Sequence, residues 1–183
     1  MTNDVKLQDT AVIAEKMWVY KYISSPVGQL KLIASDQGLA GVLWENDDPP
    51  YRIKIRSYIE DNTHLFLLET ERQLKAYFTG QLQAFDLKLD FVGTPFQKQV
   101  WQALLTIPFG QTRTYKQIAQ QIANPKAVRA VGAANRKNPI SIIAPCHRVI
   151  GTSGHLVGFA GGLEVKAWLL NLEASSLNAK IND

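Results

Sequence analysis

The net charge of the chain changes sign near residue 93, and this change limits the folds that the chain can adopt. Residues 1–92 hold 10 Lys and Arg against 13 Asp and Glu, a net charge of −3. Residues 93–183 hold 10 against 3, a net charge of +7. A chain of 183 residues has room for one domain or two small ones. We therefore predict an N-terminal domain over 1–92 and a C-terminal domain over 93–183.

The N-terminal half has the pattern of a small antiparallel sheet. Runs rich in Val, Ile, Tyr and Leu, separated by turn residues, predict strands over 18–24, 29–35 and 38–44 joined as hairpins. Apolar spacing predicts a helix over 64–78, and alternation of apolar and polar residues predicts a strand over 85–91. Together with a mostly helical second half, this indicates an α+β or α/β fold.

The C-terminal half carries repeated helix start signals. Thr94-Pro95-Phe96-Gln97 combines a Thr N-cap, a Pro at the first helical position and a Gln that closes a capping box. That helix is expected to bury Val100, Trp101, Leu104 and Leu105. Thr114-Tyr115-Lys116-Gln117 opens a second, short helix, and Asn124-Pro125 is expected to cap a third over 126–137. Two short helices joined by a tight turn are typical of a helix-turn-helix, although many helical hairpins bind nothing.

A long stretch of this half has no acidic residue. Between Asp90 and Glu164 there are eight cations and no carboxylate: Lys98, Arg113, Lys116, Lys126, Arg129, Arg136, Lys137 and Arg148. Such a segment indicates a polyanionic partner. The alternative is a solvated basic face without a partner.

One face of the predicted helix over 126–137 is flat and small. Arg129, Gly132, Ala133 and Arg136 follow the spacing of a single helix face. A Gly inside a helix costs about 1 kcal/mol relative to Ala, so close approach of another molecule would explain it. The minor groove of DNA, roughly 6 Å wide, suits such a smooth helix. Tight packing against another helix is the alternative.

The only cysteine of the chain lies in Pro145-Cys146-His147-Arg148. A thiol attacks as its thiolate, and neighbouring cations lower the thiol pKa from about 8.5 towards neutrality. A lone Cys is often a small buried hydrophobe, but an inert position gains nothing from two adjacent cations. On the last predicted helix, Glu173 falls on the apolar face, where a carboxylate is either partnered or costly. It could instead reach water from the end of that helix.

Several classes of protein are excluded by composition. One Cys rules out a disulfide framework, and three isolated His offer no metal-ligand spacing, so we expect neither metal nor cofactor. Residues 1–16 do not resemble a signal peptide, and no apolar run is long enough for a membrane span. We expect a soluble, cytoplasmic protein with no membrane partner.

Pro-Cys-His-Arg-Val-Ile-Gly resembles the active-site signature of the O6-alkylguanine-DNA alkyltransferases, also called methylated-DNA–protein-cysteine methyltransferases. The resemblance extends over about residues 94–173 and includes, in order, Tyr115, Asn-Pro-Lys-Ala-Val-Arg-Ala-Val-Gly, Asn138-Pro139, the Gly-Gly loop and Leu-Leu-Asn-Leu-Glu173. It implies a ribonuclease-H-like N-terminal domain and a C-terminal domain with a winged-helix-like helix-turn-helix.

The resemblance also implies a reaction. The protein would bind duplex DNA through the minor groove, flip an O6-alkylguanine out of the stack and accept its alkyl group on Cys146. His147, oriented by Glu173, would take the thiol proton through water, and Tyr115 would stabilise the leaving guanine. Asn138 would link the recognition helix to the site, and Arg129 would fill the vacated stack.

The remaining implied sites are the DNA contacts and the base pocket. DNA contacts would come from Thr114, Tyr115, Arg129, Gly132, Ala133 and Arg136. The pocket would be formed by Asn135, Val149, Phe159, Ala160 and Gly161. Phe159-Ala160 stands where some relatives have Tyr-Ser, so a serine hydroxyl to O6 is missing. We expect a monomer that can bind DNA cooperatively, and O4-alkylthymine is a second candidate substrate.

Transfer should occur once per molecule, because an S-alkyl thioether cannot be hydrolysed and no second cysteine is present. Two other functions fit parts of the pattern. A module that only recognises alkylated bases would not need the reactive Cys146. A cysteine hydrolase would usually carry its His far from its Cys in sequence, and the acid-free basic segment would have no purpose.

Overall fold

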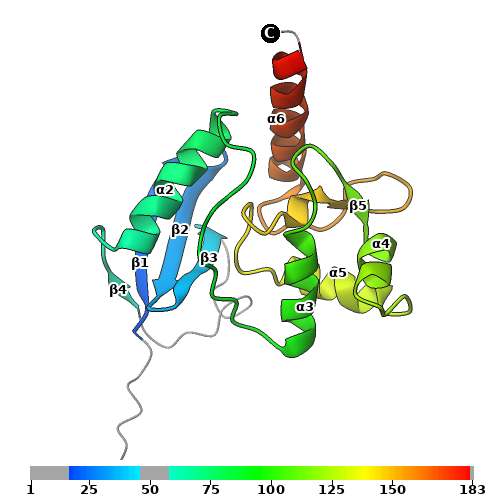
Figure 1. The fold of residues 1–183 in the computed structure, drawn as a ribbon, viewed down its shortest axis with the longest axis horizontal. Coiled ribbons are helices and arrows are strands. Elements are labelled where there is room, and N and C mark those ends of the chain that lie inside the picture. Colours follow the sequence, from blue (N-terminus) through cyan, green and yellow to red (C-terminus); the bar gives the residue numbers. More distant parts are fainter. Residues whose placement is uncertain (1–16, 46–57, 182–183) are drawn as a thin grey trace, which may run out of the picture.

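The computed structural model describes residues 17–45 and 58–181. A sheet with one covering helix forms the N-terminal half, and helices dominate the C-terminal half (Figure 1). This is the α+β architecture that the sequence predicts. The segment 1–16, which we predicted not to be a signal peptide, lies outside the described residues.

The N-terminal sheet has the strand order β3-β2-β1-β4. Its strands are β1 (Val19–Ser25), β2 (Gly28–Ser35), β3 (Gly38–Trp44) and β4 (Ile59–Glu60). The first three form the predicted antiparallel meander, whereas β4 pairs parallel to β1, so the sheet is mixed. Helix α2 (Leu65–Phe78) covers one face (Figure 1) and buries Leu67, Leu74 and Tyr77.

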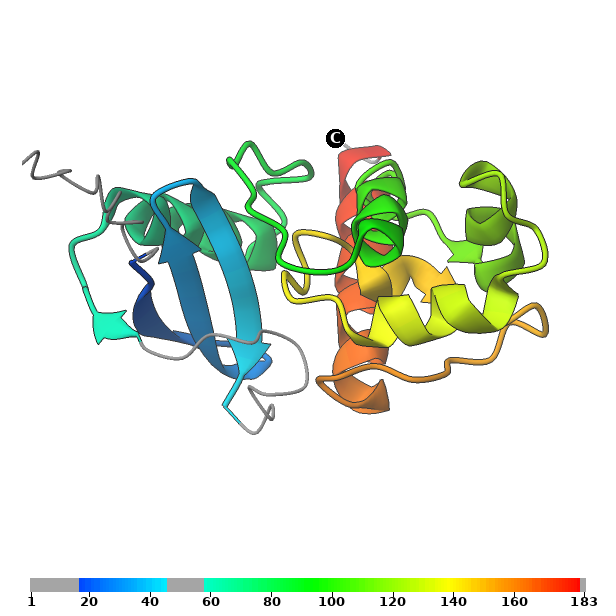
Figure 2. The same cartoon turned by 90° about the horizontal axis from the view of Figure 1, so that it is seen from below.

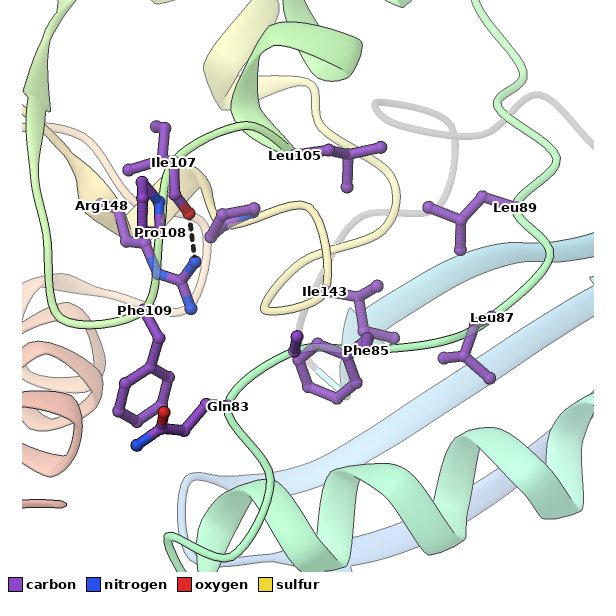
Figure 3. Close-up of a pocket in the computed structure, with 12 residues that line it drawn as sticks. Gln83, Phe85, Leu87, Leu89, Leu105, Ile107, Pro108, Phe109, Ile143 and Arg148 are labelled. Atoms are coloured by element: carbon purple, nitrogen blue, oxygen red, sulfur yellow. Dashed lines mark hydrogen bonds between the residues drawn. The ribbon is translucent and has the colours of Figure 1, made fainter. Parts of the chain in front are cut away.

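The strand predicted over 85–91 is wrong. Only a single bridge forms, in which the Leu39 N–H donates to Lys88 O at 2.8 Å and the Asp90 N–H donates to Leu39 O at 2.7 Å. The alternation has a different cause: the segment crosses from one half of the molecule to the other (Figure 2), and Phe85, Leu87 and Leu89 point into the space between the halves (Figure 3).

The C-terminal half contains the predicted helices. They are α3 (Pro95–Leu104), α4 (Tyr115–Gln121), α5 (Val128–Arg136) and α6 (Leu163–Ile181). Both predicted capping boxes form, at Thr94 with Gln97 and at Thr114 with Gln117. A short parallel pair, β5 (Arg113–Thr114) with β6 (Val149–Ile150), joins the start of α4 to the Cys146 segment.

Two details of the helix predictions are wrong. Helix α5 begins at Val128 rather than residue 126, because residues 124–127 form a turn in which the Ala127 N–H donates to Asn124 O at 3.0 Å. Leu105 is 39% exposed, since α3 ends one residue before it and the chain turns away. Within the described residues, no helix is long and apolar enough to cross a membrane.

The two halves are joined along the outer edge of β3. The Val42 N–H donates to Pro139 O at 2.9 Å, and the Ser141 N–H donates to Val42 O at 3.4 Å. The chain that leads to Cys146 is therefore attached to the N-terminal sheet, and one continuous hydrophobic core includes residues of both halves.

Candidate active site

Cys146 begins a single 3-10 turn, η1 (Cys146–Arg148), that is fixed from behind by Asn138. The Asn138 amide donates to Ala144 O at 2.7 Å, and its Oδ1 accepts from the Ile140 N–H at 3.0 Å. Both bonds are buried, so the backbone before the Pro145–Cys146 pair is held in one conformation.

Next to the thiol lies a buried charged cluster centred on Glu173. Glu173 and His147 are both 0% exposed, and Cys146 is 3% exposed. Arg148 donates from Nε to both carboxylate oxygens at 3.1 and 3.0 Å and from Nη2 to Oε1 at 2.9 Å. The Gly110 N–H donates to Oε2 at 2.9 Å, and the Tyr77 hydroxyl donates to Oε1 at 2.7 Å. The carboxylate predicted on the apolar face is thus fully partnered.

These contacts keep Glu173 ionised. Burial alone would raise its pKa, but the hydrogen bonds from His147 and Arg148 and the charge of Arg148 outweigh burial and lower the pKa to about 2. Burial lowers the pKa of His147 and outweighs the opposing pull of Glu173. Arg148, which is always protonated, is therefore the cation that keeps the carboxylate charged, and His147 is neutral at physiological pH.

The geometry fixes the tautomer of His147. Its Nε2 lies 2.7 Å from Glu173 Oε1, and because an ionised carboxylate only accepts hydrogen bonds, Nε2 must carry the proton. Nδ1 is then the basic nitrogen, and it is buried without a hydrogen-bond partner among the described residues. The ring can therefore accept one proton on the side away from Glu173, as a general base requires.

Two features of this cluster differ from the sequence prediction or were absent from it. Arg148 was counted with the cations that face a polyanion, but it is buried against Glu173 and donates to Ile107 O at 2.6 Å. Tyr77 was not predicted, because it comes from the N-terminal helix α2, 96 residues away from Glu173 in the sequence. A buried Tyr on an apolar helix face carries no local signal of such a contact.

A cavity of about 280 Å³ lies between the halves, and Arg148 of the charged cluster lines it (Figure 3). Its wall includes Arg148, whose guanidinium donates to Ile107 O in the figure, and side chains from the crossing segment and the loops facing it.

On the outer surface, α5 and the loop after β6 enclose a groove of about 560 Å³. The predicted face of α5 lines it: Arg129, Gly132, Ala133 and Arg136. The Tyr115 ring forms another wall, and its hydroxyl donates to Val157 O at 3.3 Å. A Cβ added at Gly132 would meet only the Tyr115 ring, at 3.9 Å, so internal packing does not require glycine there.

The other predicted residues are not among those that line this groove. Thr114 is the N-cap of α4 and accepts from the Gln117 N–H. Asn135 and Val149 are buried. Phe159 packs edge-on against Trp44 with ring centroids 5.3 Å apart, while Ala160 and Gly161 line a smaller hollow beside Trp44.

Gly161 has a packing reason to be glycine. A Cβ there would come within 2.8 Å of the Trp44 ring. No group of three or more His, Cys, Asp or Glu suited to a metal ion occurs within the part of the chain that the structure describes.

Almost the whole described chain matches one family of known proteins. Residues 18–91 match the family described as 6-O-methylguanine DNA methyltransferase, ribonuclease-like domain, and residues 95–175 match the DNA binding domain of the same family. The chain belongs to the 6-O-methylguanine DNA methyltransferase family. The resemblance seen in residues 94–173 therefore extends to the N-terminal half.

Individual members are similar over nearly their full lengths. The methylated-DNA–protein-cysteine methyltransferase of Methanosarcina acetivorans is 49% identical over 156 residues, which covers 85% of this chain and 98% of the relative. The crystal structure of the Mycobacterium tuberculosis O6-methylguanine methyltransferase superposes with a TM-score of 0.79 at 47% identity, covering 87% of this chain and 94% of that one. A structure of the M. tuberculosis protein in complex with DNA gives the same TM-score at 46% identity, covering 86% of this chain and 94% of that one.

Proposed function

We propose that this protein repairs duplex DNA by moving the alkyl group of O6-alkylguanine onto its own Cys146, once per molecule. The observation that carries the proposal is the protonation state of the buried cluster. Glu173 fixes the proton of His147 on Nε2 and leaves Nδ1 without a partner among the described residues, on the residue that follows the only cysteine in the sequence. Relatives named as methylated-DNA–protein-cysteine methyltransferases support the same reaction.

DNA binds along the groove lined by α5. The smooth patch around Gly132 and Ala133 enters the minor groove, and Arg136 contacts the phosphates. Arg129 occupies the gap that opens when the damaged base leaves the stack. The M. tuberculosis relative solved with DNA supports DNA as the partner.

The chemical step is a displacement at the alkyl carbon. His147 Nδ1 accepts the thiol proton, through a water molecule, and the Cys146 sulfur forms a bond to the alkyl carbon. The bond from that carbon to O6 breaks, and its electron pair passes into the guanine ring. The guanine anion then takes up a proton, while the Tyr115 hydroxyl stabilises it by a hydrogen bond.

The other residues of the site have supporting roles in this proposal. Asn138 holds the backbone before Cys146, and Thr114 and Asn135 support the walls of the DNA and base sites. Val149 and the loop of Phe159, Ala160 and Gly161 border the flipped base. We propose domain limits of 1–92 and 93–183, action as a monomer, and O4-alkylthymine as a second candidate substrate.

The intact mass of the protein tests this function. After incubation with a duplex that carries one O6-methylguanine, the protein should gain the mass of one methylene, on Cys146 alone. Cys146→Ser should show no gain. Binding of the damaged duplex without any mass change would instead indicate a module that recognises alkylated bases, and repeated turnover of a thiol ester would indicate a hydrolase.

A further inference from the structure

Helix α6 buries a lysine beside the turn that contains Cys146. The Lys166 side chain is 0% exposed, although it starts from a surface helix. Lysine is almost never fully buried unless its charge is paired. The position therefore needs an electrostatic explanation that packing does not supply.

The direct hydrogen bonds of Lys166 do not supply a negative charge. Its Nζ donates to Val149 O at 2.6 Å and to Val157 O at 3.0 Å. Both acceptors are neutral carbonyls. No ion pair of Lys166 with a carboxylate occurs in residues 17–45 and 58–181, where the buried Glu173 is engaged by Arg148 instead.

The remaining group that can become negative here is the thiol of Cys146. Val149 closes the 3-10 turn, and its N–H donates to Cys146 O, so the ammonium is attached to the same turn as the sulfur. Burial lowers the pKa of Lys166, and the charge of the Cys146 thiolate raises it again.

The net charge of the buried ionisable groups around Cys146 is zero only if Cys146 is a thiolate. Glu173 and Arg148 cancel, and His147 is neutral. The other titratable group near Cys146 is Tyr115 on α4, whose pKa is raised by burial and further by the thiolate, so it too is neutral. Arg136 on α5 also faces Tyr115 but is exposed to solvent. Among the residues that the structure describes around Cys146, Lys166 is then the buried cation without a paired carboxylate, and a thiolate would neutralise it.

We propose that Lys166 is the counter-ion of the Cys146 thiolate and acts as a positioning residue for alkyl transfer. This rests on the proposed function, because it concerns the same nucleophile. Lys166 stabilises the thiolate, and His147 remains the route by which the proton leaves. The lysine also donates to the carbonyls of both Val149 and Val157. It therefore connects the turn that contains Cys146 to Val157, the residue whose carbonyl accepts from Tyr115 in the groove.

Ionisation of Cys146 can be followed without DNA. The ultraviolet absorbance of the thiolate, taken as the difference between the protein and its Cys146→Ser variant, reports one group because the chain has one cysteine. In Lys166→Met the pKa of Cys146 should rise by about 1–3 units, the usual effect of a nearby opposite charge. Transfer at neutral pH should slow by about 10- to 1000-fold and recover at alkaline pH, with unchanged affinity for duplex DNA.

The exposed Lys88→Met, which lies before Asp90 and outside the acid-free basic segment, is the matched control and should change neither the thiol titration nor the rate. A folded Lys166→Met with the original thiol pKa would overturn the proposal even if the protein repairs DNA. Conversely, a correct thiol shift without alkyl transfer from DNA would overturn the proposed function alone.

Reciprocity provides a second measurement that does not depend on the folding of Lys166→Met. If Lys166 stabilises the thiolate, the thiolate must stabilise the ammonium by the same factor. Nitrogen NMR of the Lys166 side chain should show a charged ammonium at neutral pH in the unaltered protein and a pKa lower by about 1–3 units in Cys146→Ser. An equal Lys166 pKa in the two proteins would exclude the ion pair.

Discussion

The Tyr77 hydroxyl donates a hydrogen bond to Glu173 Oε1 at 2.7 Å and lies 3.5 Å from His147 Nε2. Tyr77 belongs to α2 of the N-terminal half, whereas Glu173 and His147 belong to the C-terminal half. The N-terminal half therefore supplies one of the donors that orient the proposed proton acceptor. Burial raises the pKa of Tyr77, and the charge of Glu173 raises it further, so the hydroxyl stays protonated and remains a donor.

Tyr77→Phe tests this contact. The ring is fully buried and keeps its packing in the variant, so only the hydrogen bond to the carboxylate is lost. A bond to a charged group contributes about 2 kcal/mol, and urea unfolding should show a loss of that order. Alkyl transfer should slow, because His147 loses one of the groups that fix its partner.

The matched control is Tyr22→Phe, in which the hydroxyl of a 43% exposed ring is removed. This change should leave both stability and transfer as they are. Equal stability of Tyr77→Phe and the unaltered protein would mean that the hydroxyl contributes nothing to the cluster.

Glu173 should give the protein a characteristic loss of stability in acid. Its pKa falls from 4.5 to about 2 on folding. A carboxylate with a lowered folded pKa contributes stability that is complete above its unfolded pKa and is lost as the pH falls towards the folded value. Stability should therefore decline between about pH 4.5 and pH 2 through this group.

Glu173→Gln should remove that part of the acid dependence and cost about 3–5 kcal/mol at neutral pH, because Arg148 would remain buried without its counter-ion. Urea unfolding across the acid range measures both effects. Glu69→Gln, at an exposed ion pair with Arg72, is the control and should change the curve little because solvent screens it. A Glu173→Gln curve parallel to the original would contradict the assignment.

Local signals in the sequence were sufficient for most elements of the fold. Capping at Thr94 and Thr114 depends on residues within one helical turn, and both capping boxes form. The strand predicted over 85–91 is wrong because alternation records only which side chains are half-buried. Alternation does not show whether the segment is a strand of a sheet or, as here, an extended segment that packs against the other half of the molecule.

The chemistry of the site was predictable only in part. The Cys-His pair is adjacent in sequence, and Glu173 was suspected because a carboxylate on an apolar face needs a partner. Tyr77 and Lys166 could not be assigned from sequence, because their roles come from tertiary contacts with distant backbone and side chains. Arg148 is counted from the sequence among the cations expected to meet a polyanion, but it is buried against Glu173, because sequence proximity does not tell which cations are buried.

Substitution of Gly132 by Ala should change stability and DNA affinity in opposite directions. Gly132→Ala should raise the free energy of unfolding by up to about 1 kcal/mol, because Ala favours the helix and its Cβ meets only the Tyr115 ring. Affinity for duplex DNA should fall several-fold, and Gly132→Leu should lower it further by blocking the approach to the groove. Thermal melting and fluorescence anisotropy measure the two quantities.

Ala130→Leu, also exposed on α5 but outside the face of Arg129, Gly132, Ala133 and Arg136, is the control for bulk. It should leave DNA affinity unchanged. Full affinity in Gly132→Leu would mean that this face does not approach DNA.

Arg129 and Arg136 should have different roles, although both are exposed on the same face of α5. If Arg136 contacts a phosphate, Arg136→Ala weakens binding to any duplex and lowers the salt slope of log affinity by about 0.9. Arg129→Ala removes the side chain proposed to hold the vacated space in the stack. It should slow alkyl transfer from duplex DNA at least tenfold at saturating DNA, because the flipped state becomes less populated.

Transfer from a single-stranded oligonucleotide distinguishes these roles, since an unpaired base costs less to extrude. Arg129→Ala should regain most of its lost rate with this substrate, when its concentration saturates the protein. A rate that stays equally low on single-stranded and duplex substrates would place Arg129 in the chemical step rather than in base extrusion. Intact mass against time, at saturating substrate, measures both rates with the same readout.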